Sequence, residues 1–117
     1  RDRSNTPLQP LITLHNSVFV EATQAFAQRV QQDVPSGLHE QVVRAFRLAL
    51  AREPSADEAT ELEKLFADAK SSFGAAPDTA SAAVGKFQPA GVAMADAAAW
   101  VAIARIILNL DEFLTRE

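Results

Sequence analysis

The 117-residue chain contains no cysteine, which excludes a disulfide framework, a thiolate metal site and a covalently attached c-type haem within these residues. Histidine is scarce. Neither His15 nor His39 has a second histidine or a carboxylate at the three- or four-residue spacing of a helical metal site, and each is interpreted as a helix-end residue. No serine lies in the nucleophile-elbow pattern of a hydrolase. The sequence therefore identifies no catalytic, cofactor-binding or metal-ligating residue.

An excess of positive charge and a hydrophobic run of membrane-spanning length are also missing. The formal net charge is −4, so no basic face is expected and nucleic acid is not a predicted partner. The most apolar run, residues 97–110, is shorter than the roughly 20 residues of a membrane span and contains Arg105, which predicts a buried helix and no membrane insertion. The opening "RDRSNTP" has no methionine or signal-peptide pattern, and we interpret the chain as part of a longer protein.

The composition is that of a globular protein, with 48% hydrophobic and 22% charged residues. No segment alternates polar and apolar residues as a strand does, and the many alanines disfavour a sheet. The predicted fold is all-α, a compact bundle of about four to five main helices around a central hydrophobic C-terminal helix. We expect residues 1–117 to form one domain, with a variable connection at about 71–95.

Two helices are predicted in the first third of the chain. Pro7 favours a short helix over Leu8–His15, and Asn16 or Ser17 can cap a longer one that "DVPSG" ends. In the longer helix, helical spacing predicts an inward face and a solvent face. The inward residues are Phe19, Ala22, Thr23, Phe26 and Val30, and the solvent-facing ones are Glu21, Gln24, Gln28 and Arg29.

The next two helices are separated by "REPSADE", in which Pro54 ends one helix while Ser55 and Glu58 have the spacing of a capping box. In the first of them, which begins near Leu38, Glu40 and Arg44 stand one turn apart in the favourable acid-first order. The predicted inward residues of the two helices are Leu38, Val42, Ala45, Phe46, Ala49 and Leu50, then Ala59, Leu62, Leu65, Phe66 and Ala69.

A long connection rich in Ala, Ser, Gly and Pro runs from Ser71 to about Gly91. Two interpretations are open for it: a short helix near Thr79–Val84, or partial mobility. The final helix is expected to begin near Asp96 and has almost no polar face, so other helices should surround it. Trp100 is interpreted as a core anchor of that helix.

The acidic pair Asp111 and Glu112 has the chemistry of a metal-binding or acid/base pair. Adjacent helical residues point about 100° apart and do not converge on one atom, so a structural role is favoured. In that role Asn109 ends the long helix and Asp111 caps a last short turn. Three arginines, at positions 44, 47 and 52, have the chemistry to bind an anion or a partner's acidic surface, although a solvated helix face is the commoner role for such residues.

Three segments resemble one family. "RSNTPLQPLITLHNSVFVEATQAFAQRV", "RAFRLALAREPSADE" and "WVAIARIILNLDEFLTRE" are similar to the front, middle and end of the planctomycete-type PSD-one domain, a domain of unknown function. Pro10, His15 and Val18 depart from the usual residues of the pattern, at positions that affect packing. The residues from Ser71 to Ala95 match only as a variable insertion.

The resemblance implies a context rather than a reaction. Such domains form the C-terminus of large exported proteins that often carry a cytochrome c-like domain upstream, so the haem would lie there and no cofactor is expected in this chain. We therefore expect a non-catalytic, extracytoplasmic module (periplasm or cell surface) that packs against other domains of its parent chain. The alternative is part of a composite hydrolytic or redox active site completed by upstream domains. The oligomeric state stays open.

The polar residues of the matching segments form a further hypothesis. Because buried polar groups need partners, we expect them to join the two ends of the chain in one cluster. Its members are Arg3, Asn5, Gln9, Asn16, Arg47, Asn109, Asp111 and Glu112.

Overall fold

Five helices and no strand make up the part of the chain that the structure describes. The computed structural model describes the backbone of residues 17–115 and the side chains of residues 17–110. The all-α prediction is confirmed, and the predicted helix over Leu8–His15 lies outside the described residues. The helices are α2 (Ser17–Asp33), α3 (Leu38–Leu50), α4 (Ala56–Gly74), α5 (Pro77–Val84) and α6 (Met94–Thr115).

The predicted long connection is shorter than the sequence suggested. Helix α4 continues past Ser71 to Gly74, and α5 follows almost at once. Of the two interpretations for this region, the short helix is confirmed. Irregular backbone remains between α5 and α6, over residues 85–93.

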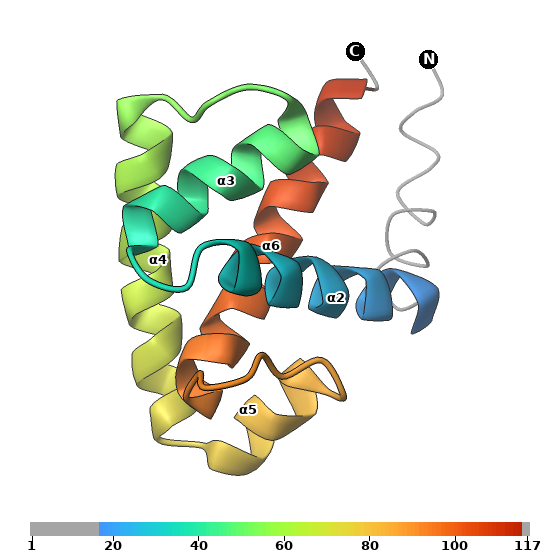
Figure 1. The fold of residues 1–117 in the computed structure, drawn as a ribbon, viewed down its shortest axis with the longest axis vertical. Helices are drawn as coiled ribbons and strands as arrows, with labels where there is room; N and C mark the ends of the chain where they lie inside the picture. Colours follow the sequence, from blue (N-terminus) through green and yellow to red (C-terminus); the bar gives the residue numbers. More distant parts are fainter. Residues whose placement is uncertain (1–16, 116–117) are drawn as a thin grey trace.

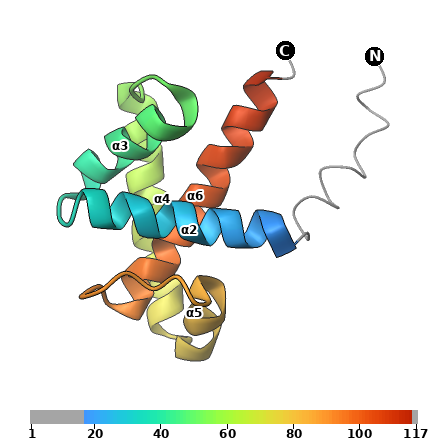
Figure 2. The same ribbon diagram turned by 45° about the vertical axis from the view of Figure 1, so that its right-hand side comes forward.

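Helix α6 is the centre of the bundle (Figure 1), and each of the other four helices contacts it. Helix α2 crosses α6 near the middle of its length, and α5 packs beside its first turns (Figures 1 and 2). Within residues 17–115, none of the helices combines the length and the apolar character that a membrane span requires.

Helix α6 is buried on all sides over residues 97–100, as its sequence predicted. The run from Ala97 to Trp100 is at most 1% exposed, and Ile103, Ala104 and Ile107 are buried further along the helix. The ring of Phe66 from α4 lies 6.3 Å from that of Trp100, centroid to centroid, in a tilted arrangement. Trp100 is therefore the core anchor that the sequence indicated.

The second half of α6 is enclosed less completely than predicted. Arg105, Ile106 and Asn109 are exposed on it. Asn109 lies three residues after Ile106 and four after Arg105, which places the three side chains on one side of the helix. Helix α6 thus has a solvent-facing side near its C-terminal end that the surrounding described helices leave uncovered.

The indole N–H of Trp100 is a buried donor, and one glutamine supplies its acceptor. Trp100 Nε1 donates to Gln41 Oε1 at 2.7 Å, while Gln41 Nε2 donates to the backbone carbonyl of Val34 at 2.8 Å. A single side chain on α3 thereby joins the first half of α6 to the segment that follows α2. Because an unpaired buried donor is costly, this contact fixes how α3 lies on α6.

The corner between α3 and α4 is built around the predicted capping box, which is confirmed. Ser55 Oγ accepts from the backbone N–H of Glu58 at 3.1 Å, and Glu58 Oε1 accepts from the backbone N–H of Ser55 at 2.8 Å. Both carboxylate oxygens of Glu58 also accept from Arg52, at 2.9 and 3.0 Å. The Arg52 guanidinium, in turn, lies 5.3 Å from the ring centroid of Phe46, a buried residue of α3.

Replacing Gln41 with alanine should destabilise the fold, because the Trp100 indole N–H would lose its acceptor within the core. We expect Gln41→Ala to lower the free energy of unfolding by about 1–3 kcal/mol, measured by urea denaturation. Gln32→Ala, at an exposed position of α2, is the matched control and should stay within about 0.5 kcal/mol of the parent. Equal small effects of the two substitutions would contradict the bridging role of Gln41.

The capping box should also make stability depend on pH in a predictable direction. Hydrogen bonds from Arg52, and then from the backbone N–H of Ser55, lower the pKa of Glu58 from 4.5 to about 2. A carboxyl whose folded pKa is lowered stabilises the fold above its unfolded pKa and loses that contribution as pH falls toward the folded value. The stability difference between the parent and Glu58→Gln should therefore be largest above pH 4.5 and shrink toward pH 2.

Urea denaturation over that pH range measures the difference. Glu61→Gln, an exposed glutamate one turn along α4, is the control and should show no such trend. A parent-minus-variant difference for Glu58→Gln that stays constant with pH would show that the carboxylate charge does not stabilise the corner.

Candidate functional site

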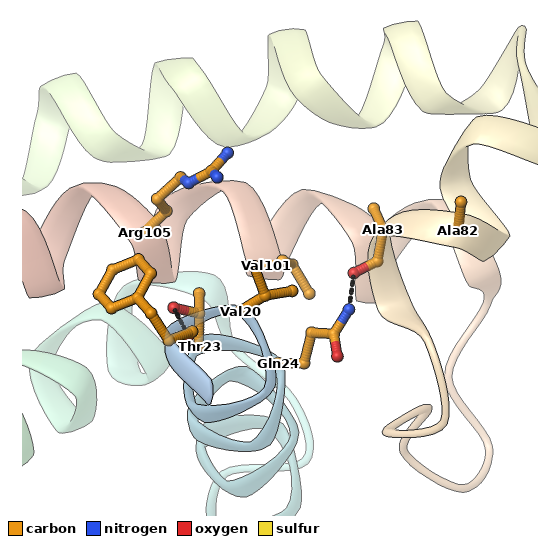
Figure 3. A pocket seen from close by; sticks show the side chains of 8 residues that line it. Val20, Thr23, Gln24, Ala82, Ala83, Val101 and Arg105 are labelled. Atoms are coloured by element: carbon orange, nitrogen blue, oxygen red, sulfur yellow. Dashed lines mark hydrogen bonds between the residues drawn. The ribbon is translucent and has the colours of Figure 1, made fainter. Parts of the chain in front are cut away.

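A hollow of about 200 Å³ opens between α2, α5 and α6. Figure 3 shows residues of all three helices around it, with Arg105 at the end opposite Ala82 and Ala83. Most of the lining side chains are apolar, and Arg105 is the charged one among them. The lining residues are Phe19, Val20, Thr23, Gln24, Ala82, Ala83, Val101 and Arg105.

Gln24 connects α2 to α5 at one wall of the hollow. Its predicted solvent-facing position is therefore wrong. It is only 7% exposed, and its Nε2 donates to the backbone carbonyl of Ala83 at 2.8 Å (Figure 3). The last carbonyls of a helix have no intrahelical partner, so the Gln24 amide completes the end of α5. An eight-residue helix is too short to be stable alone, and α5 depends on such tertiary contacts.

The inner face of α2 is more polar than predicted, because Gln24 and Gln31 are buried on it together with Thr23, whose inward position is confirmed. Thr23 Oγ1 donates to the carbonyl of Phe19 and Gln31 Nε2 to the carbonyl of Ala27, each at 2.9 Å. Among the described side chains, no buried nitrogen or oxygen lacks a partner. By contrast Ala22, which was predicted to face inward, is exposed.

The sequence did contain a signal for this face. Val20, Gln24, Ala27 and Gln31 follow one another at spacings of four, three and four residues, which is one side of a helix. Glutamine is mostly exposed in folded proteins, so this spacing alone does not mark the face as buried.

The three arginines considered as an anion site are paired within the chain. Arg44 donates to Asp33, at 3.2 Å from Nε and 3.0 Å from Nη2, rather than to Glu40 one turn away. Arg47 pairs with Glu53 and Arg52 with Glu58. Because each of these cations already has a carboxylate, the three together do not form an open anion site.

The hypothesis of a polar cluster at the chain ends remains largely outside the described residues. Arg3, Asn5, Gln9 and Asn16 lie outside them, and so do the side chains of Asp111 and Glu112. Of the remaining two members, Arg47 is exposed and pairs with Glu53, and Asn109 is exposed on α6. The cluster stays a prediction.

The helix end predicted at the acidic pair is wrong. Helix α6 runs without interruption from Met94 to Thr115, so Asn109 does not end it and Asp111 does not cap a separate turn. Asn and Asp have only a modest preference against the interior of a helix, and their occurrence alone does not stop one. The two carboxylate-bearing residues thus belong to the last turns of α6.

His39 lies in the first turn of α3, which confirms its predicted place at a helix end. Its Nδ1 is 2.9 Å from Glu63 Oε2 on α4, and this hydrogen bond raises the pKa of the imidazole. His15 lies outside the described residues. The side chains that the structure describes include no group of three or more His, Asp or Glu placed to hold a metal ion.

Glycine at position 85, directly after α5, should be required for the packing of α5 against Gln24 at the wall of the hollow. Its backbone has φ 62° and ψ −137°, a region that is almost restricted to glycine, and an added Cβ would lie 2.9 Å from Gln24 Oε1. We expect Gly85→Ala to lower the free energy of unfolding by about 1–3 kcal/mol, measured by urea denaturation.

Two matched glycines separate the causes of that loss. Gly91 has φ 75° with open space around the added Cβ, so Gly91→Ala reports the backbone cost alone. Gly74, the last residue of α4, has open space without a positive φ and should tolerate alanine. If Gly85→Ala costs no more than Gly91→Ala, close packing of the Gln24 amide against Gly85 is not what fixes α5.

Comparison with known families agrees with the resemblance drawn from the sequence. The model of the PSD1 family, described as a protein of unknown function (DUF1553), matches residues 1–66. No curated protein and no solved structure matches the chain. The matched residues include α2, α3 and the first half of α4, and they make up more than half of the 117 positions. The chain therefore belongs to the PSD1 family of proteins of unknown function.

Proposed function

We propose that this chain is a helical module that does no chemistry of its own and packs against other domains of a larger exported protein. The observation that carries the proposal is the apolar surface around the hollow. Val18 is 74% exposed and Ile106 is 36% exposed, and each is the chain neighbour of a residue that lines the hollow. Exposed large apolar side chains beside a concave apolar surface are typical of a site that another protein surface covers.

The family resemblance supports the context of the proposal. The resemblance implies that such a domain forms the C-terminus of an exported protein, and we therefore propose that the module lies outside the cytoplasm, in the periplasm or at the cell surface. A cytochrome c-like domain upstream would hold its own haem. This chain has no cysteine for covalent attachment of a c-type haem, so it would contribute a contact surface to such a protein.

Hydrogen–deuterium exchange tests the proposal on the chain alone and within the intact parent protein. We expect slower amide exchange within the parent at the segments around the hollow, residues 18–24 and 101–106, because docking opposes local opening of the helices there. Exchange rates that are equal in the two samples over all described helices would show that no other domain packs on this module.

A substitution adds a second readout. Ile106→Glu places a charge on the exposed apolar surface and should reduce the protection in the parent. Ala67→Glu, at an exposed position of α4 away from the hollow, is the matched control and should leave the protection unchanged.

A further inference from the structure

We propose that the hollow between α2, α5 and α6 receives one apolar side chain from another domain of the parent protein, and that Arg105 pairs with a carboxylate beside that side chain. The inference rests on the proposed function and names the chemistry of the partner segment.

Arg105 differs from every other arginine of the described segment in having no ion pair. Four arginines, at positions 29, 44, 47 and 52, have carboxylates of Asp33, Glu53 or Glu58 within 4.0 Å. Over residues 17–110, no ion pair or hydrogen bond involves the Arg105 side chain. In a chain of net charge −4, a guanidinium that has no carboxylate partner among the described residues can pair with a carboxylate of another domain.

Among the residues that line the hollow, Arg105 is the cationic side-chain donor for an occupant. The Thr23 hydroxyl donates to the carbonyl of Phe19, and the Gln24 amide donates to the carbonyl of Ala83. The other lining side chains are apolar. An occupant therefore meets an apolar wall and, at one end, a guanidinium with geometry suited to a carboxylate.

The size of the hollow favours a side chain over a separate small molecule. Its volume is about 200 Å³, whereas pockets that bind cofactors and drug-sized ligands measure roughly 300–1,000 Å³. A leucine, isoleucine or phenylalanine side chain placed next to Asp or Glu in a partner segment matches both the apolar wall and the cation. Burying the apolar side chain and pairing the charge in one step is the arrangement of anchor residues at protein interfaces.

Charge reversal at Arg105 tests the inference in the intact parent protein. We expect Arg105→Glu to abolish the exchange protection of residues 18–24 and 101–106, with amide rates rising about tenfold toward those of the isolated chain. Arg105→Lys retains the charge and should retain most of the protection. Lys64→Glu, an exposed lysine of α4, makes the same charge change away from the hollow and should have no effect.

The outcomes separate this inference from the function on which it rests. Protection of these segments that survives Arg105→Glu, or protection confined to other helices, would overturn the inference and leave the docking function standing. Equal exchange in the parent and in the isolated chain would overturn both. Circular dichroism of the isolated variants distinguishes loss of docking from loss of folding, since Arg105 is exposed and its replacement should leave helix content unchanged.

Discussion

Burial of the first half of α6 is the constraint on which the rest of the fold depends. Within it, residues 97–100 present apolar side chains in every direction, so a helix on one side of them is not enough. Alanines at positions 97–99 allow close approach by neighbouring helices, whereas Trp100 fills the wider space toward α4. Short α5 packs against Ala97 and Ala98, and longer α2, α3 and α4 enclose the segment around Trp100. The arrangement of the other helices in space follows from the need to cover this one element.

Enclosing α6 leaves a few polar groups inside, and glutamines satisfy several of them. Gln41 accepts from the Trp100 indole N–H, and Gln24 donates to a carbonyl at the end of α5. Both hydrogen bonds connect residues 59 positions apart in the chain, so they contribute tertiary rather than local stability. A glutamine side chain offers both a donor and an acceptor on a flexible stem, which lets one residue join two elements. The bundle is thereby specified by polar contacts as well as by apolar packing.

The features that could be predicted from the sequence are those set by local rules. The spacing of apolar residues located the four long described helices, and the Ser55–Glu58 spacing located the start of α4 closely. The buried position of Gln24 was not predicted, because its partner Ala83 lies on another helix and only the fold brings the two together. The predicted helix cap at Asp111 was wrong for a related reason. Aspartate favours the start of a helix, but it caps one only where the backbone already leaves the helical conformation, and α6 is continuous there. The hollow, formed by three helices, has no local signature.

The electrostatics of the chain restrict what can lie against α6, whichever partner does so. At the α3–α4 corner and the end of α2, carboxylates close to the arginines in sequence or space neutralise them. Arg105 emerges instead from an apolar stretch of α6 with no carboxylate paired to it over residues 17–110. A purely apolar surface that covered the guanidinium would have to remove it from water without compensation, at a cost larger than the gain from a small apolar contact. A partner must therefore supply an acidic group or leave the Arg105 guanidinium in solvent. Only a partner that supplies the acidic group would be bound selectively at the hollow.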